Sequence, residues 1–353
     1  MLCKKLGLAP GGPDDDNGVP AFLGKAMSAP HGKSVTNALE LLVNLGAMQP
    51  ETNSLTDLGE CLAVLSLEPR VGKMTIWSYL LGCARVAVNM AVAMSYKSPF
   101  VLPPAHARKT AETAKVQLSR GSESDQVTVH YALEAMAQLL RGNGNQQSFS
   151  AFCRKNYVGV NTLQMISDIR KNLTRELTTL GFPNPTTVPP SNPRNKNGGG
   201  KKPNNGQVQS YHNRHNDDHA LWQAAIAAGL YPNVAFRKRG EVNFSTMTNQ
   251  KVKVHVSSVN ALRGQPLNAK CDIPKGELEF VCFGEMVKGK AQFFTVNQTT
   301  HLASPLPLLL LCGTSLSVRP FRDAAAEGEE DKTKQPNKQG HPKTAILTLD
   351  GWM

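Results

Sequence analysis

The chain has 353 residues and a formal net charge of +12, from 39 lysines and arginines against 27 aspartates and glutamates. At roughly 100–200 residues per domain this length predicts two or three domains, and 40% hydrophobic residues exclude a wholly disordered protein. The positive charge indicates a polyanionic partner. We place nucleic acid ahead of a membrane because the sequence has no amphipathic anchor or lipidation signal.

The apolar stretches are short. The longest uninterrupted one, around residues 308–312, is far too short to cross a bilayer. The first seven residues lack the apolar core of a signal peptide, which disfavours secretion and predicts a reducing compartment: nucleus, cytoplasm or mitochondrion. The seven cysteines include no Cys-x-x-Cys pair, so a disulfide framework and a thiolate zinc site are both disfavoured.

Two short helices are expected after a loop-rich lead-in rich in Gly, Pro and Asp. In the first, apolar residues at positions 35, 39, 42 and 43 share one face, Ser34 is the candidate cap, and Gly46 marks the end. The second begins near Thr56 and ends before Pro69. This pair is typical of a winged-helix remnant or of the start of a helical bundle.

A helical domain of about a hundred residues follows. Its expected helices cover the ranges 76–94, 107–118, 127–140, 149–152 and 162–180. Ser124 and Asp125 supply a cap and a first-turn acid for the third of them.

Residues 183–219 contain almost no apolar side chains and several cations. We interpret them as a solvated linker insertion, with a basic arm that contacts phosphate as the alternative. Three histidines and two aspartates near its end have spacings that could reach one divalent metal, but a solvated polar tract is favoured. These residues are His212, His215, Asp217, Asp218 and His219.

After a short helix at 220–229 the apolar period becomes two. Five strands separated by Gly, Pro and Asn turns are expected at 231–237, 241–247, 251–257, 277–287 and 291–297. Five short strands in a basic chain fit an oligonucleotide-binding (OB) barrel best. Nearby aromatics more often form the core than a stacking platform. They are Tyr231, Phe236, Phe280, Phe283, Phe293 and Phe294.

No nucleotide-hydrolysing machinery is predicted. Gly32-Lys33-Ser34 resembles the end of a phosphate loop, but Met27 stands where that loop needs glycine, and no Asp-Glu-x-His or Asp-Glu-x-Asp run occurs. We therefore predict no catalytic, cofactor-binding or metal-ligating residue, and no cofactor held by this chain.

The segment 251–258 is the most informative for binding. Strict alternation would place Val252, Val254 and Val256 on one face, with Lys251, Lys253, His255 and Ser257 on the other. That second face offers cations for phosphate and hydroxyls for the backbone of a single strand, although an ordinary solvated sheet face fits equally well. Arg237 lies in a basic turn that supports the same interpretation.

Several short motifs, in order, resemble the C-terminal region of DEAH-box and RNA helicase A-like (DExH) RNA helicases. Each motif is weak alone, but the ordered set covers nearly the whole chain. They are VTNALELL at 35–42, LTDLG at 55–59, EPRVGKM at 68–74, YKSPF at 96–100, SD at 124–125, FC at 152–153, LGF at 180–182, GLYPNVA at 229–235, HVSSVN at 255–260, FGE at 283–285, SPLPLLL at 304–310 and LDGW at 349–352.

The resemblance implies a multidomain α+β protein whose N-terminal two-thirds are mostly helical and precede a five-stranded OB-like barrel. The expected parts are a winged-helix remnant (1–68), a helical ratchet domain (69–182), an Asn/Gly/Pro linker insertion (183–219), the OB-fold (220–319), a charged insertion (320–343) and the closing segment of the barrel (344–353).

The family's two RecA-like domains, which bind ATP and Mg²⁺, precede the matched region. The resemblance therefore implies that this chain is an accessory part of such a helicase, either a fragment or a stand-alone subunit. By itself it is expected to have no ATPase activity. Expected partners are single-stranded RNA, a RecA-like core in cis or trans, and activator proteins on the winged-helix/ratchet face, with no membrane. The alternative is an inactive protein-interaction scaffold. Carried over from the family, the RNA-contact candidates are His255, Ser257, Ser258 and Asn260; charge alone adds Arg237, Lys251 and Lys253.

Overall fold

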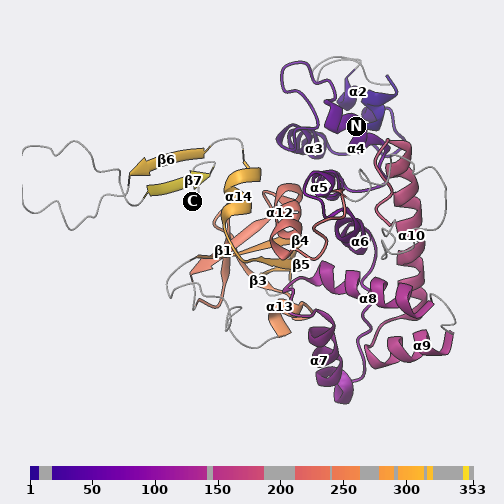
Figure 1. The fold of residues 1–353 in the computed structure, drawn as a ribbon. Coiled ribbons are helices and arrows are strands. Elements are labelled where there is room, and N and C mark those ends of the chain that lie inside the picture. The colour runs from indigo at the N-terminus through magenta and orange to yellow at the C-terminus, as the bar shows by residue number, and fades with distance from the viewer. Residues whose placement is uncertain are drawn as a thin grey trace, which may run out of the picture.

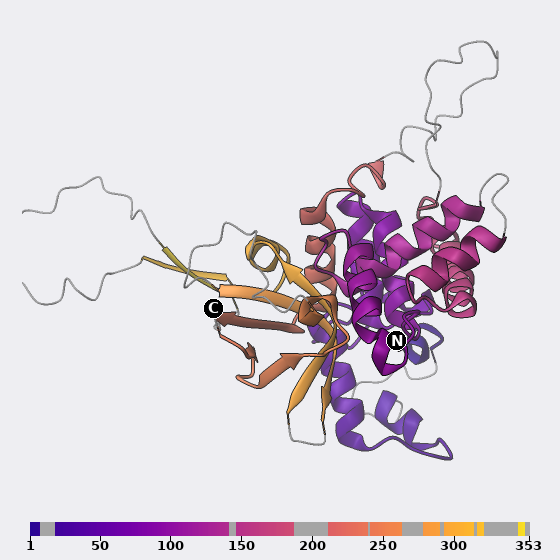
Figure 2. The same cartoon turned by 90° about the horizontal axis from the view of Figure 1, so that it is seen from below.

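The computed structural model describes residues 1–7, 18–140, 146–186, 211–238, 241–262, 278–289, 293–313, 316–320 and 345–349, the last two ranges by their backbone. Within these ranges, helices are followed by a closed five-stranded β-barrel, which confirms the predicted fold class. The barrel lies beside the helical bundle, and both views show the two in contact (Figures 1 and 2).

The first helices are α1 (Leu2–Lys5), α2 (Val19–Gly24), α3 (Gly32–Asn44) and α4 (Asp57–Val64). An isolated antiparallel bridge between Met48 and Leu55 joins the two ends of the α3–α4 turn. Thr56 caps α4 as predicted, because its hydroxyl accepts from the N–H of Gly59. The expected Ser34 cap of α3 is wrong: His31 accepts from the N–H of Lys33 at 3.2 Å, so the helix begins earlier.

The helical domain contains α5 (Pro69–Leu80), α6 (Ala84–Ser95), the short 3₁₀ helix η1 (Ala105–Ala107), α7 (Arg108–Leu118), α8 (Asp125–Leu140), α9 (Gln146–Lys155) and α10 (Val160–Thr179). The single helix expected over 76–94 is wrong. Gly82, with a φ of +73°, follows the end of α5, and α6 begins at Ala84 after its N-cap residue Cys83. Apolar residues continue across this turn, which is why the helical period conceals it.

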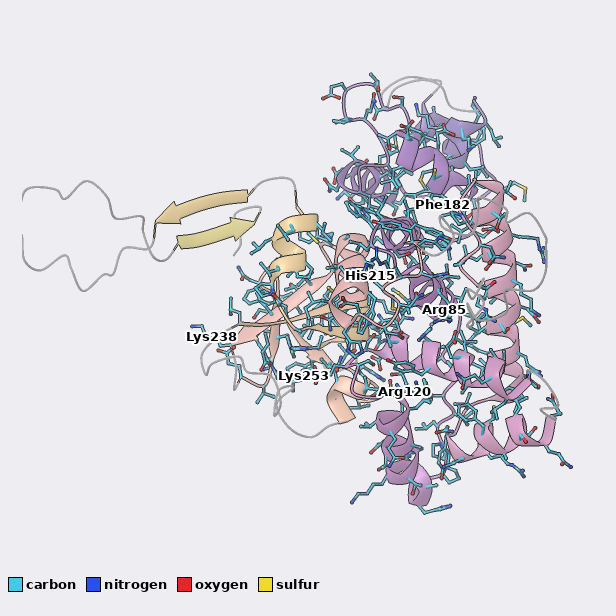
Figure 3. The ribbon with its side chains drawn as sticks, in the orientation of Figure 1. Arg85, Arg120, Phe182, His215, Lys238 and Lys253 are labelled. Atoms are coloured by element: carbon cyan, nitrogen blue, oxygen red, sulfur yellow. The ribbon has the colours of Figure 1, made fainter. Side chains whose placement is uncertain are left out.

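The polar tract before the barrel packs on this break. The N–H groups of Arg85 and Val86, which start α6, donate to the side chains of Asn213 and Asn216 at 3.0 and 3.2 Å. His212 is buried and stacks on Tyr79. The expected full solvation of this tract is therefore wrong for residues 211–218, because their amides cap the first turn of α6. The N–H of His215, labelled in Figure 3, donates to the carbonyl of Gly82 at 2.8 Å.

The helical domain and one side of the barrel share a hydrophobic core that continues from α5 through α12 (His219–Leu230) to β4 and β5. Trp222 and Leu230 are almost fully buried in it. Gly229 lets α12 approach α5 closely, since a Cβ there would lie 2.6 Å from the Cα of Met74. The short helix α14 (Leu306–Leu311) packs on α12 and completes this layer (Figure 1).

The barrel strands are β1 (Val234–Lys238), β2 (Phe244–Thr246), β3 (Lys251–Val254), β4 (Leu278–Lys288) and β5 (Phe294–Leu302). The order around the barrel is β1-β2-β3-β5-β4, with a parallel pair only between β3 and β5. Phe280 and Phe283 are buried as predicted, whereas Phe293 is 57% exposed and does not belong to the core.

The third strand ends earlier than expected. It stops at Val254, and Val256, predicted to face the core, is 75% exposed. The N–H of His255 still donates to the carbonyl of Val296 at 3.0 Å, after which the N–H of Ser258 donates to the carbonyl of His255 at 2.9 Å and closes a turn. This turn leads into the short helix α13 (Val259–Leu262).

Two further strands, β6 (Leu316–Pro320) and β7 (Ala345–Leu349), pair antiparallel with each other. They form a two-stranded sheet separate from the barrel order. Residues 344 and 350–353 of the expected closing segment lie outside the described residues, and residues 345–349 pair with β6. Within the described residues, no helix is long and apolar enough to span a bilayer.

A buried histidine ties α8 to α6. His130 lies 2.8 Å, through its Nδ1, from the Nδ2 of Asn89. Burial lowers the pKa of His130 to about 3, and the positive charges of Arg85, Arg120 and Arg170 add to the shift. The pKa of this histidine is near 6.5 in the unfolded chain, so between pH 6.5 and about pH 3 the unfolded chain binds more protons than the folded chain. Stability should therefore be complete above pH ~6.5 and fall as the pH drops toward 3.

We expect the variant His130→Asn to remove most of this pH dependence, which amounts to at most about 1.4 kcal/mol per pH unit. Urea unfolding at pH 7.5 and 5.0, compared with the exposed-site control His219→Asn, measures it. Equal slopes in the variant and the wild type would show that other groups control acid stability.

Candidate nucleic-acid interface

A groove of about 510 Å³ runs along the junction of the ratchet helices and the barrel. We call it the interdomain groove. Its walls come from the end of α6 and the residues after it, from α7, from the N-terminus of α8, from the 255–258 turn and from β4 and β5. The lining residues are Met94, Ser95, Tyr96, Lys97, Ser98, Lys115, Asp125, His255, Ser257, Ser258, Glu285, Asn297 and Gln298.

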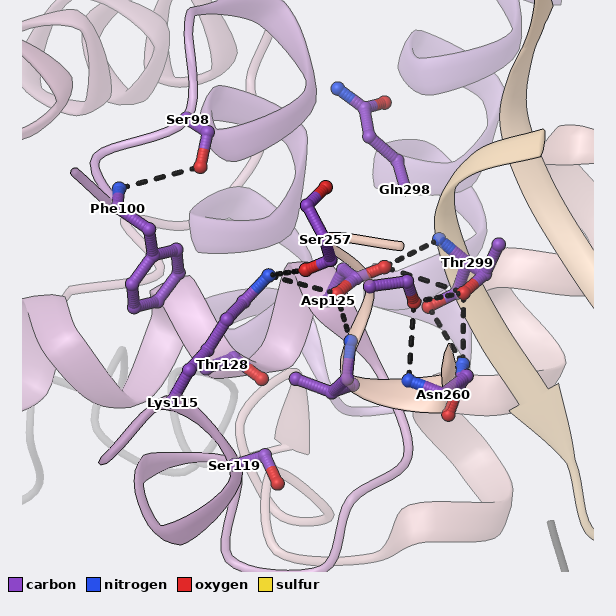
Figure 4. Close-up of polar contacts among 12 residues, drawn as sticks. Ser98, Phe100, Lys115, Ser119, Asp125, Thr128, Ser257, Asn260, Gln298 and Thr299 are labelled. Carbon is purple, nitrogen blue, oxygen red and sulfur yellow. Dashed lines mark hydrogen bonds and ion pairs between the residues drawn. The ribbon is translucent and has the colours of Figure 1, made fainter. Parts of the chain in front are cut away.

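Asp125 holds the two walls of the groove together (Figure 4). Its Oδ1 accepts from the N–H of Val259 at 2.9 Å and lies 3.3 Å from the ammonium of Lys115. Its Oδ2 accepts from the N–H of Thr299 at 3.0 Å and is 3.3 Å from that residue's hydroxyl. A carboxylate at the start of α8, only 13% exposed, therefore anchors both the 255–262 segment and β5.

Lys115 on α7 adds to the contacts that Asp125 makes between the two walls. Its ammonium donates to the carbonyl of Ser257 at 2.6 Å and lies 4.8 Å from the ring centroid of Phe100. The cation is therefore shared among a carboxylate, a carbonyl and an aromatic face, and it is mostly buried. We infer that Lys115 fixes the 255–258 turn and supplies little charge to solvent.

Further contacts extend this junction. The hydroxyls of Ser124 and Thr300 are 2.7 Å apart, and Thr300 also donates to the Oε1 of Gln126 at 2.7 Å. The side-chain amide of Asn260 donates to the carbonyl of Glu123 at 3.1 Å. Because several of these groups are buried and paired across the junction, the ratchet helices and the barrel meet in a defined geometry.

The 255–258 turn presents His255 and Ser257 to the groove. The Nδ1 of His255 lies 2.8 Å from the Ser257 hydroxyl, and it also accepts from the Ser257 N–H at 3.2 Å. His255 is half-buried and Ser257 is exposed, so both can reach a ligand while their own contacts hold them. On the opposite wall Lys97 is exposed, 5.8 Å from the ring of Tyr96.

The other predicted site residues fall into two groups. Ser258 and Asn260 are buried, and both bond to the hydroxyl of Thr299, at 2.7 and 2.9 Å, so they support the turn. Lys251 and Lys253 are exposed on β3, and Lys253 lies 4.8 Å from the ring centroid of Phe293. Figure 3 shows Lys253 on the barrel.

Arg237 is engaged inside the barrel wall. Its Nε lies 2.7 Å from the Oε2 of Glu279, whose side chain is 0% exposed, and its guanidinium covers the ring of Phe244 at 4.5 Å. It also donates to the carbonyl of Glu241 at 3.0 Å. This arrangement neutralises a buried carboxylate and leaves Arg237 10% exposed.

Lys97, Lys115 and Asp125 line the groove although the sequence does not predict them there. The sequence shows residues 96–100 only as a family motif, and Ser124-Asp125 as a family motif and a helix cap. No local signal reveals that Asp125 meets residues 134 and 174 positions away. Among the described residues no group of three His, Cys, Asp or Glu side chains could hold a metal ion, including those of the 211–219 tract.

Three family models match this chain in the same order as its domains. Residues 38–67 match the winged-helix part of the helicase associated domain (HA2), residues 68–138 match its ratchet-like part, and residues 222–315 match the oligonucleotide/oligosaccharide-binding (OB)-fold. The matched OB-fold covers the barrel and the 255–258 turn, and the ratchet match covers Lys97, Lys115 and Asp125.

Curated relatives agree with these matches. The chain is 33% identical to the DExH-box ATP-dependent RNA helicase DExH1 of Arabidopsis thaliana over 68% of this chain and 22% of the relative. It is 30% identical to the ATP-dependent DNA/RNA helicase DHX36 of Homo sapiens over 69% and 22%. It is 29% identical to the ATP-dependent RNA helicase dhx29 of Xenopus laevis over 86% and 20%.

The chain thus spans about a fifth of the length of these relatives. The ordered domain matches, the closed barrel and the helices that precede it all agree. The chain belongs to the DEAH/DExH RNA helicase family, as the C-terminal region that comprises the HA2 winged-helix, ratchet and OB-fold domains.

Proposed function

We propose that this chain binds single-stranded RNA in the interdomain groove and serves as the RNA-gripping accessory part of an ATP-dependent DEAH/RHA-type helicase. The observation that carries the proposal is that Lys97 on the ratchet wall and His255 and Ser257 on the barrel turn line the same open groove. Cations suit phosphates, and hydroxyl and imidazole groups suit sugar and phosphate oxygens.

The family matches support this proposal without specifying residues. The matched OB description refers to oligonucleotide or oligosaccharide ligands, and the relatives are called RNA helicases. The net charge of +12 favours an oligonucleotide over an oligosaccharide as the ligand, because nucleic acid is a polyanion. ATP binding and hydrolysis would be supplied by RecA-like domains, in cis or in trans, and activator proteins would contact the winged-helix/ratchet face.

The proposed contacts are electrostatic and therefore depend on salt. Lys97 would contact phosphate in the groove, while Lys251 and Lys253 would extend the path over the barrel. Each phosphate contact to a single strand should add about −0.7 to the slope of log affinity against log salt. Three contacts predict a slope of about −2. Ser258 and Asn260 would act by holding the turn that carries His255 and Ser257.

We expect Lys97→Ala to weaken binding of a short oligouridylate by about three- to tenfold at low salt and to make the slope shallower by about 0.7. Fluorescence anisotropy between about 50 and 200 mM salt gives both quantities. Lys33→Ala, which removes an exposed lysine at the start of α3, is the charge-matched control. Equal affinity losses in the two variants would indicate a diffuse charge effect and contradict a groove contact.

Absence of any RNA binding by the wild-type chain would overturn the proposal. In that case the protein-interaction scaffold becomes the better hypothesis. Capture of a protein partner from nuclease-treated extract, lost on substitution of the winged-helix/ratchet face, would then distinguish it.

A further inference from the structure

A second cavity of about 390 Å³ adjoins the interdomain groove and, unlike the groove, has exposed apolar side chains at its rim. We call it the apolar pocket. Its rim includes Val101 and Leu102, which are 53% and 78% exposed, and Val256, which is 75% exposed. Three apolar side chains so exposed around one cavity indicate a binding surface for an apolar or aromatic group.

Two aromatic residues line this pocket. The ring of Phe100 is covered on one side by the Lys115 ammonium at 4.8 Å. Tyr157 has a φ of +53°, an uncommon conformation for a bulky residue, and its carbonyl accepts from the N–H of Val101 at 2.8 Å. Tyr157 is the left-handed residue that ends α9, where the N–H of Val158 donates to the carbonyl of Cys153 at 2.9 Å, so the helix end places this aromatic residue at the pocket.

The pocket and the groove share Ser98, Lys115 and Ser257. A single strand with its phosphates near Lys97 and its sugar near Ser257 would therefore pass directly beside the pocket mouth. The exposed Arg108 and Glu112 lie at its α7 side, where a guanidinium can meet phosphate or a ring face and a carboxylate can accept from a base amino group.

We propose that the apolar pocket receives one unstacked nucleobase of the RNA strand bound in the groove. The inference rests on the proposed function, since it assigns a base site to that same strand. A base offers a flat apolar face to Tyr157 and the aliphatic rim, and polar edges to Arg108 and Glu112. Continuity with a phosphate-binding groove favours a nucleobase over an apolar peptide side chain as the occupant.

The test separates base contacts from backbone contacts. Affinities are measured for an oligouridylate and for a wholly abasic ribose-phosphate strand of the same length. Base–aromatic stacking contributes about 1–3 kcal/mol, so the wild-type chain should prefer the uridylate by about 5- to 150-fold. Tyr157→Gly removes the ring and relieves the backbone, because glycine accepts a positive φ, so this variant should fold. Leu102→Ser changes an exposed side chain and provides a second variant.

We expect both pocket variants to lower the uridylate-to-abasic ratio by about fivefold or more. Met165→Ser, at an exposed apolar site on α10, should leave the ratio unchanged. Lys97→Ala should weaken both ligands equally and keep the ratio. An unchanged ratio in both pocket variants would overturn the base site while leaving the groove proposal intact; loss of all RNA binding by the wild-type chain would overturn both.

Discussion

Replacement of Asp125 by alanine is expected to lower the free energy of unfolding by about 3–5 kcal/mol. The change leaves the mostly buried Lys115 ammonium without its carboxylate and leaves the N–H groups of Val259 and Thr299 without their acceptor. Removal of one partner of a buried pair costs more than loss of the contact, because the remaining charge stays desolvated.

The variant should lose stability locally, in the segments that Asp125 binds, as well as in the whole fold. Amide hydrogen exchange in residues 255–262 and 297–301 should accelerate more than in α9 or α10, since only the first two segments depend on Asp125. RNA affinity should also fall, because the turn that presents His255 and Ser257 loses its anchor. Asp168→Ala is the control, as its pair with Lys171 is 62–65% exposed and should contribute less than about 1 kcal/mol. Equal stability of the two variants would contradict the role of Asp125.

The second large effect concerns Arg237, which the sequence suggested as a phosphate contact. We expect Arg237→Ala to destabilise the barrel by about 3–5 kcal/mol, because it would leave the fully buried carboxylate of Glu279 unpaired. The double variant Arg237→Met with Glu279→Leu removes both charges and keeps the volume, so it should recover most of the lost stability. Thermal unfolding of the single variants Arg237→Met and Glu279→Leu and of the double variant measures the coupling between the two residues.

RNA titration of the stable double variant then distinguishes the two roles of Arg237. A structural role predicts the wild-type salt slope, since Lys97, Lys251 and Lys253 are untouched. A slope shallower by about 0.7 would show that Arg237 contacts phosphate despite its ion pair.

Local sequence patterns predicted the helical region and the barrel, because helical and strand periods depend on near neighbours. They also predicted the cap of α8, where the Ser124 hydroxyl accepts from the N–H of Val127 at 3.2 Å. They failed where an apolar pattern continued through a change of direction. Gly82 separates α5 from α6, and the 255–258 turn follows β3 although Val256 continues the alternation. In both places main-chain hydrogen bonds form a turn although the apolar pattern of the helix or strand continues through it.

The groove itself could be predicted only in part. His255 and Ser257, two of the predicted RNA-contact candidates, both line the groove, but Lys97 on its other wall follows a helix that ends more than a hundred residues earlier. Asp125 was expected only as a first-turn acid of its helix. Its bonds to Val259 and Thr299 arise when the barrel packs against α8, and a helix-local signal carries no information on that contact.

The most direct test of RNA binding in the interdomain groove is ultraviolet crosslinking of oligouridylate to the whole chain, followed by mass spectrometry of the crosslinked peptides. We expect crosslinks at residues 94–98 and 255–257, lost together at high salt. Crosslinks confined to the winged-helix region α1–α4, or the absence of crosslinks at both of these segments, would contradict the proposal.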